Sequence, residues 1–226
     1  MGDWYDHDRD DWRSRCDAGL VASRKYADRL PPKHREPWPD FGDYLLSRDL
    51  SPHIARANLW YPSHAAGDDV PRIVMPATSG QEGNFFWQAR SMTTMEPRFQ
   101  SPHGVCSGDA VIVVYPFGLT YEAQAGFPEW TEAAVVEGPM CALAVAGTGR
   151  LGIATMGADP PEERLDNIVR LVKGVPCFVI PDNDRVEAFV RVFMYLTNRG
   201  IKCRMQPVRG AKDFAELSLG NRLRFF

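Results

Sequence analysis

Two acidic segments carry the side chains of this chain that are best suited to chemistry. Glu137 and Gly138 end the segment AAVVEG, and Asp182-Asn183-Asp184 ends the segment CFVIPDND. Each follows an apolar run rich in β-branched residues, which is typical of a buried strand. Open α/β sheets bind ligands at the carboxyl ends of their strands. Carboxylates without histidine or cysteine are the ligands that Mg²⁺ or Mn²⁺ prefers, so Glu137, Asp182 and Asp184 are candidate metal ligands and catalytic residues.

The Asp-x-Asp segment also has a structural interpretation. Asn and Asp are common in solvated turns and at helix N-termini, so Asp182-Asn183-Asp184 could simply cap the helix that follows. Against this, Asp182 and Asp184 alternate along an extended segment and point to the same side, where two carboxylates repel unless a cation lies between them. The strand that ends at Glu137 supplies a third carboxylate, which favours the metal site.

Composition narrows the class of protein. The 226 residues carry a net charge of −3 with 44% hydrophobic residues, which is typical of a globular protein. This charge argues against a polybasic nucleic-acid binder but not against a local basic groove. The five cysteines are scattered without a Cys-x-x-Cys pair, which excludes a zinc ribbon in this sequence. Cys141 and Cys177 lie in apolar runs and are expected to be buried thiols. Neither a signal-peptide core nor a membrane-length apolar segment occurs, so we predict a cytoplasmic protein.

The elements that must position the acids suggest three parts. Residues 1–39 are predicted to be a helical and proline-rich appendage, with four prolines in LPPKHREPWP. Residues 40–118 are predicted to form a small α+β unit, with two short helices split at Ser51 and several strands joined by Gly-rich turns. Residues 119–226 alternate strand and helix, which predicts an α/β unit: a parallel sheet flanked by helices, with a last helix starting in AKDFAELS.

Basic residues add a possible phosphate-binding groove. Arg72, Arg90 and Arg98 all fall in the unit upstream of the acids, and arginine is suited to bidentate contacts with phosphate. Each could equally be a solvated charge on a strand. Lys212 could approach the acids, or it could pair with Asp213 or Glu216 on a helix.

These motifs together resemble the catalytic core of bacterial and phage primases. A strand ending in Glu-Gly, a βα unit and a strand ending in Asp-x-Asp resemble the Toprim domain. Upstream, PRIVMPATSGQEGNFFWQARSM followed by EPRFQSPHG resembles the first half of a primase core, and GAKDFAELS resembles the segment after the last Toprim strand. The resemblance covers roughly residues 40–219. The chain departs from the pattern in Arg185-Val186-Glu187, where a small residue and glycine are usual, and in Ala215, where asparagine is usual.

The resemblance implies synthesis of short RNA primers on single-stranded DNA from ribonucleoside triphosphates. Asp182 and Asp184 would hold Mg²⁺ or Mn²⁺, Glu137 would be a further ligand or a proton-transfer group, and basic side chains would hold phosphates. Without a zinc ribbon and a helicase region, either another chain such as a replicative helicase supplies these functions in trans or the protein works without them. Their absence also suggests a phage or plasmid origin. Two alternatives remain open, namely a metal-dependent Toprim nuclease and a non-catalytic nucleic-acid-binding replication module.

Overall fold

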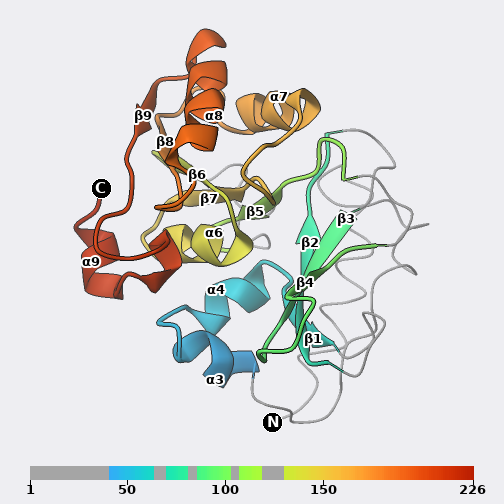
Figure 1. Ribbon diagram of the computed structural model, residues 1–226. Coiled ribbons are helices and arrows are strands. Elements are labelled where there is room, and N and C mark those ends of the chain that lie inside the picture. The colour runs from blue at the N-terminus through green and yellow to red at the C-terminus, as the bar shows by residue number, and fades with distance from the viewer. Residues whose placement is uncertain (1–40, 64–69, 81–85, 103–106, 119–129) are drawn as a thin grey trace.

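The fold is described from a computed structural model, which describes residues 41–63, 70–80, 86–102, 107–118 and 130–226. Figure 1 shows the elements of these segments. The predictions for residues 1–39 and for most of the Gly-rich turn before Phe86 lie outside the described residues.

Two helices and a four-stranded sheet form the first part of the described chain. The helices are α3 (Phe41–Leu46) and α4 (Pro52–Ala57), and the strands, in sheet order, are β1 (Tyr61–Ser63), β2 (Arg72–Ala77), β3 (Phe86–Ser91) and β4 (Phe99–Gln100). All neighbours in this sheet are antiparallel. The predicted split between the helices is confirmed, because the Ser51 hydroxyl accepts a hydrogen bond from the Ile54 amide and Pro52 opens α4.

A five-stranded sheet forms the second part. Its strands, in the order β5-β7-β6-β8-β9, are β5 (Ile112–Val114), β7 (Leu151–Ala154), β6 (Ala133–Val136), β8 (Cys177–Ile180) and β9 (Cys203–Met205). The β6–β7, β6–β8 and β8–β9 pairs are parallel, which confirms the predicted α/β class, whereas β5 joins β7 antiparallel. The division of the chain at residue 118 stays a prediction, although β5 lies before it and pairs within this sheet.

Helices cover both faces of the five-stranded sheet (Figure 1). The helix α6 (Pro139–Ala146) lies on one face, and α7 (Glu162–Leu171) and α8 (Val186–Asn198) lie on the other. Side chains alternate along each strand, so that Ala134 and Val136 of β6 pack with α6, whereas Ala133 and Val135 pack with α7 and α8. The prediction of a helix that starts in AKDFAELS is wrong. That segment forms only the 3₁₀ turn η2 (Phe214–Glu216), and α9 (Leu219–Leu223) begins after it.

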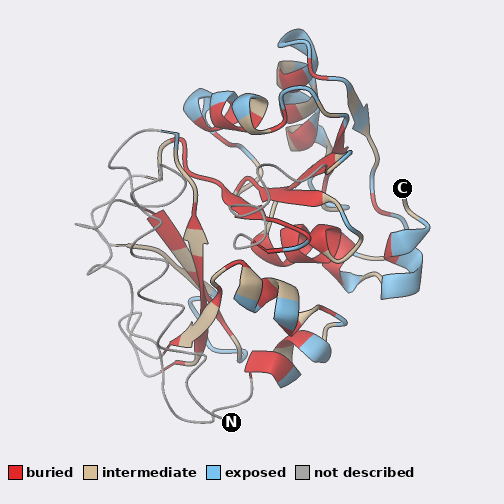
Figure 2. Ribbon diagram, turned by 180° about the vertical axis from the view of Figure 1, so that it is seen from behind, coloured by how far each residue is buried: buried red, intermediate tan, exposed pale blue. Residues whose placement is uncertain are grey.

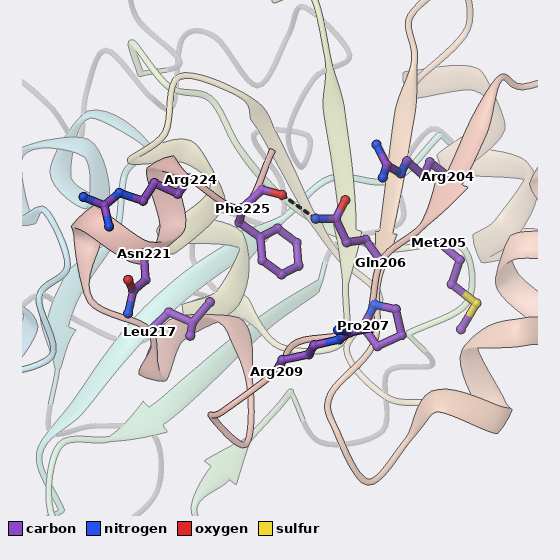
Figure 3. Close-up of a pocket in the computed structure, with 9 residues that line it drawn as sticks. All are labelled: Arg204, Met205, Gln206, Pro207, Arg209, Leu217, Asn221, Arg224 and Phe225. Carbon is purple, nitrogen blue, oxygen red and sulfur yellow. Dashed lines mark hydrogen bonds between the residues drawn. The ribbon is translucent and has the colours of Figure 1, made fainter.

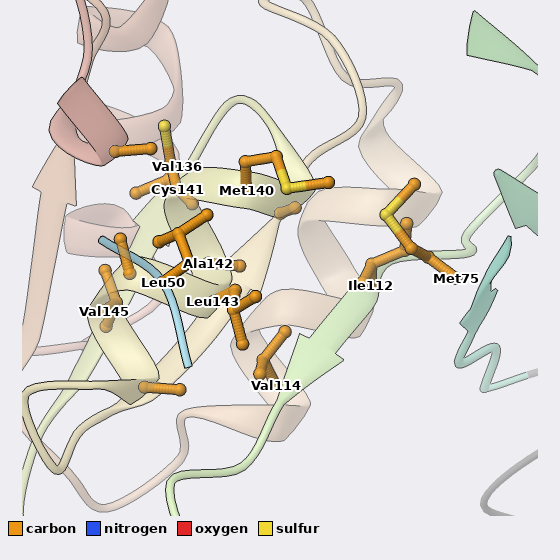
Figure 4. Packing of buried hydrophobic residues seen from close by; sticks show 14 of the residues in the cluster. Leu50, Met75, Ile112, Val114, Val136, Met140, Cys141, Ala142, Leu143 and Val145 are labelled. Atoms are coloured by element: carbon orange, nitrogen blue, oxygen red, sulfur yellow. The ribbon is translucent and has the colours of Figure 1, made fainter. Parts of the chain in front are cut away.

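The helix α6 is buried on all sides and holds the two parts together. All eight of its residues are buried, as expected for a helix that is apolar all round and covered on every face. Figure 4 shows its side chains packed with Ile112 and Val114 of β5 and with Leu50. A β-carbon built at Gly152 in β7 would lie 2.1 Å from the Ala142 carbonyl oxygen, so this close approach requires glycine. Figure 2 shows that α6 and the strands of both sheets are mostly buried.

Buried polar side chains connect segments that are distant in the sequence. The side-chain nitrogen of Asn58 donates to the Tyr115 carbonyl at 2.9 Å, and the side-chain oxygen of Asn58 accepts from the Tyr115 backbone amide at 2.8 Å. These two bonds attach the end of α4 to the end of β5. Asn167 of α7 donates to the Asp109 carbonyl at 2.8 Å, and the Asp109 carboxylate accepts from Ser79 and Gly80. These bonds fix the antiparallel sheet against the five-stranded sheet, which sets where the candidate site lies.

Candidate functional site

The first carboxylate of the site lies at the carboxyl end of the central strand β6. Glu137 follows Val136 directly, and its carbonyl accepts a hydrogen bond from the Met156 amide at 3.0 Å, which keeps the ends of β6 and β7 together. Gly138 then takes an extended conformation (φ −111°), and Pro139 starts α6. The Glu137 Oε2 atom is buried without a hydrogen-bond partner among the described residues. A buried carboxylate oxygen without a donor is costly unless a proton or a cation meets it.

The second acidic segment lies at the end of β8, next to β6 in the sheet. Asp182 is partly buried, and Asp184 is exposed at the start of the turn into α8. The Asn183 amide donates to the Lys212 carbonyl at 2.8 Å, which ties this loop to the segment that follows β9. The sequence prediction that the acids share the carboxyl edge of a parallel sheet is therefore confirmed in its geometry. Their catalytic and metal-binding roles stay predictions.

A fourth carboxylate, Asp213, belongs to the same group. It caps η2 by accepting a hydrogen bond from the Glu216 amide at 3.0 Å, and its charge raises the pKa of Asp182. We call Glu137, Asp182, Asp184 and Asp213 the acidic edge. Sequence reasoning considered Asp213 only as a partner for Lys212. The signal that could have found it is its position beside Lys212 in the segment that returns after the last strand of the sheet.

The acids of this edge perturb one another. Burial, together with the charges of Asp213, Glu137 and Asp184, raises the pKa of Asp182 to about 7, against the opposing charge of Lys212. Burial also raises the pKa of Glu137, which Arg185 and Lys212 lower and Asp184 and Asp213 raise. Mutual repulsion of this kind marks a place where negative charge is concentrated beyond what the described chain neutralises.

The donor set of the acidic edge fits a hard divalent cation. Carboxylate oxygens are the ligands that Mg²⁺ and Mn²⁺ prefer, and the unpartnered Glu137 Oε2 is an available acceptor. Among the described residues, no three His, Cys, Asp or Glu side chains are placed closely enough to hold a metal ion as they stand. The raised pKa values of Asp182 and Glu137 nonetheless indicate that the four acids are electrostatic neighbours. Side-chain rotations would have to bring their oxygens together around a cation. A cation between these like charges would favour such rotations.

Lys212 and Arg185 supply positive charge beside the acids. Lys212 is exposed and makes no ion pair with a described residue, while its backbone amide donates to the Glu216 carboxylate at 3.0 Å. Its charge acts on Asp182 and Glu137, so the structure brings it to the acidic edge. Arg185, which departs from the primase pattern, is the largest opposing charge on Glu137.

The upstream arginines are not gathered with the acids. Arg72 is fully buried and donates to the Pro97 carbonyl at 2.8 Å. Arg90 is also buried, donates to the Tyr44 hydroxyl at 3.0 Å and lies over the Phe99 ring. In the β2–β3 register Arg72 faces Ser91 and Arg90 faces Ile73, so the two side chains leave opposite faces of the sheet.

Direct phosphate contacts by Arg72 and Arg90 would require both side chains to leave these positions, and their binding role stays a prediction. Arg98 is exposed in the turn after the cis Glu96-Pro97 bond. The two described aromatic side chains of β3, Phe86 and Trp87, are buried, so they act as core residues and not as stacking platforms for bases.

Structural comparison defines the class to which this geometry belongs. The chain has the fold of primase catalytic cores. It is similar to the RNA polymerase domain of the Mycobacterium tuberculosis primase DnaG, with a TM-score of 0.56, 17% identity and coverage of 80% of this chain and 72% of that one. It is also similar to a DnaG primase catalytic domain bound to single-stranded DNA, with a TM-score of 0.54, 16% identity and coverage of 76% of this chain and 67% of that one.

A third similar structure comes from bacteriophage T7. It contains the lagging-strand DNA polymerase interacting with primase domains bound to an RNA/DNA hybrid and dTTP. The matched chain has a TM-score of 0.52 and 17% identity, with coverage of 80% of this chain and 86% of the matched chain. No known family description and no curated protein sequence matches this chain. The likeness is therefore one of fold, and it agrees with the resemblance to primase cores stated from the sequence.

Proposed function

We propose that this protein is a nucleotidyltransferase that synthesises short RNA primers on single-stranded DNA. The observation that carries the proposal is the acidic edge, in which carboxylates from the ends of β6 and β8 and from the segment after β9 lie near one another on the fold of a primase catalytic core. These acids are not balanced by ion pairs with described residues, so they are available to a cation and through it to a triphosphate.

Each member of the acidic edge has a proposed task. Asp182 and Asp184 would hold Mg²⁺ or Mn²⁺, with Asp213 as an additional anion beside them. The bound metal would supply neutralisation of triphosphate charge and orientation of the attacking hydroxyl. Glu137, whose pKa burial raises, would complete the metal site or accept a proton near the attacking oxygen. Lys212 would contact a phosphate from the exposed side.

The partners follow from this activity. The template would be single-stranded DNA and the substrates ribonucleoside triphosphates, and a replicative helicase in trans could hold the protein on DNA. Coupling of that kind raises local concentration and strengthens engagement by about 10²–10⁴. Among the described residues, no helix is both long and apolar enough to cross a membrane. A cytoplasmic location and a phage origin belong to this proposal, as does the three-part division at residues 39 and 118.

A primer-synthesis assay tests the function. The protein is incubated with single-stranded DNA, labelled ribonucleotides and Mg²⁺ or Mn²⁺, and labelled products are separated by length. We expect short ribonucleotide products that disappear in Asp182→Asn. The matched control is Asp166→Asn, which removes an exposed carboxylate on α7 outside the acidic edge and should leave synthesis intact.

The same assay separates the alternative functions. A Toprim nuclease would shorten the DNA strand in a metal-dependent way without incorporating ribonucleotides. A non-catalytic replication module would bind single-stranded DNA and change neither strand. If Asp182→Asn and the unaltered protein give the same short products, the acidic edge is not the site of synthesis.

A further inference from the structure

A cavity of about 680 Å³ lies beside the edge strand β9. It is bounded on one side by the segment that continues β9 and on the other by α9 and the residues after it. Figure 3 shows its lining residues, which are Arg204, Met205, Gln206, Pro207, Arg209, Leu217, Asn221, Arg224 and Phe225. We call this the arginine cavity. None of its lining residues belongs to the acidic edge.

Three exposed arginines give this cavity its charge. Arg204, Arg209 and Arg224 line it from three places in the chain, and their guanidinium groups form no hydrogen bond or ion pair with any described residue. Two exposed arginines in and directly after α8 differ, because Arg191 pairs with Asp159 and Arg199 with Asp166. Three uncompensated guanidinium groups around one cavity in a chain of net charge −3 favour a ligand with several negative charges.

The rest of the lining suits a ring attached to those charges. In Figure 3 the Phe225 ring is drawn in the middle of the lining residues, with the Gln206 side chain beside it. The Gln206 amide nitrogen donates to the Phe225 carbonyl, whereas its Oε1 atom is buried without a partner among the described residues. An unpartnered amide oxygen can accept a hydrogen bond from the exocyclic amine of a base, and apolar side chains can cover the face of the ring.

We propose that the arginine cavity is a second nucleotide-binding site, which holds phosphate groups through the arginines and a base near Phe225 and Gln206. Its volume lies within the range of about 300–1,000 Å³ that is typical of small-molecule sites. The ligand is either a free nucleotide or one nucleotide of a single strand, since both present the same phosphate and base. Binding here requires neither a metal at the acidic edge nor primer synthesis.

The test compares two double variants that remove equal charge. Arg204→Ala with Arg224→Ala changes the cavity, and Arg191→Ala with Arg199→Ala, called the α8 variant, changes exposed arginines in and directly after α8. The probes are fluorescent ATP and a short labelled deoxythymidine oligonucleotide, titrated in EDTA so that metal-dependent binding at the acidic edge is absent. Thermal unfolding of both variants verifies that the fold is kept, as expected for exposed side chains.

We expect the cavity variant to lose affinity for at least one probe by about tenfold or more, and the α8 variant by less than about twofold. Loss for the oligonucleotide, with the slope of log affinity against log salt reduced by about 0.7 for each lost phosphate contact, identifies a strand as the ligand. Loss for ATP alone identifies a free nucleotide. Equal affinities of the two variants for both probes overturn the proposal. Failure of primer synthesis would leave this measurement unaffected, since it is made without metal.

Discussion

The acidic edge and the buried arginines of the antiparallel sheet differ in whether their charged side chains have partners within the chain. At the acidic edge, burial and the neighbouring carboxylates raise the pKa of Asp182 and of Glu137, and Glu137 Oε2 has no hydrogen-bond partner among the described residues. In β2 and β3, Arg72 and Arg90 are buried as well, yet each donates to a nearby oxygen. The acidic edge therefore contains a carboxylate oxygen without a partner, whereas the charged groups of the antiparallel sheet are hydrogen-bonded within the fold.

The difference separates residues that await a ligand from residues that hold the structure. A buried charge without a partner lowers the stability of the folded state, so it is retained where something outside the chain completes it. A buried charge with partners stabilises the arrangement of those partners. Arg222 is a further example, because it donates to the carbonyls of Asp49 and Ala215. Its bond to Asp49 attaches α9 to the segment between α3 and α4. Substitutions in the two regions should therefore have opposite consequences.

The largest expected effect is a loss of activity at the acidic edge. Glu137→Gln keeps the shape of the side chain and removes its charge, so primer synthesis should fall by about a hundredfold or more, equivalent to about 2.7 kcal/mol of barrier. The midpoint of thermal unfolding in metal-free buffer should stay equal or rise, because the buried charge is gone. The control is Glu163→Gln, an exposed residue of α7. Reduced stability in Glu137→Gln would show that this carboxylate is structural.

Substitution of a buried arginine of the antiparallel sheet should instead lower the stability of the fold. Arg90→Met keeps most of the apolar stem but loses the hydrogen bond to Tyr44 and the contact with the Phe99 ring, so we expect about 2 kcal/mol of destabilisation in chemical denaturation. Arg98→Met, at an exposed position, should change stability by less than about 0.5 kcal/mol. If Arg90→Met instead keeps its stability and loses affinity for single-stranded DNA, Arg90 is a ligand contact and the contrast between the two regions fails.

Much of the fold could be predicted because local patterns and tertiary structure agree. The alternation of apolar strands and amphipathic helices in residues 119–226 predicts the parallel sheet that β6 to β9 form. The segment AKDFAELS was predicted wrongly as a helix. Its Asp213 caps only a 3₁₀ turn, and Phe214 is buried against Phe225, so tertiary packing overrides the local helical preference.

The candidate site could be predicted only in part, for a geometric reason. Glu137 and Asp182 follow strand-like runs, so their meeting at a sheet edge follows from the topology. Asp213 follows no such run and reaches the edge through the return of the chain after β9. The burial of Arg72 and Arg90 depends on Pro97 and Tyr44, which are distant in sequence, so no local pattern distinguishes them from solvated charges.

The acidic edge should also give stability an unusual pH dependence. In the unfolded chain Asp182 loses its proton near its ordinary pKa of 3.8, whereas in the folded protein it keeps the proton up to about pH 7. The free energy of unfolding in metal-free buffer should therefore fall as the pH rises from about 4 to about 7. Asp182→Asn should flatten this part of the profile, and Asp166→Asn should not. Profiles of equal slope for the unaltered protein and Asp182→Asn would contradict the burial of this carboxyl group.

The smallest expected effect concerns Lys212, the exposed cation at the acidic edge. Its charge lowers the pKa of Asp182 and of Glu137, so Lys212→Gln should move the acidic limb of the pH–activity profile upward, by less than about one pH unit. Lys202→Gln, at another exposed lysine, is the control. A shifted limb with an unchanged plateau means that Lys212 acts only through its field on the carboxylates. A lowered plateau means that it also contacts a substrate phosphate, since no change of pH restores a lost contact. If neither limb nor plateau changes, Lys212 lies outside the working site, and the charge opposing the acids there is supplied by Arg185.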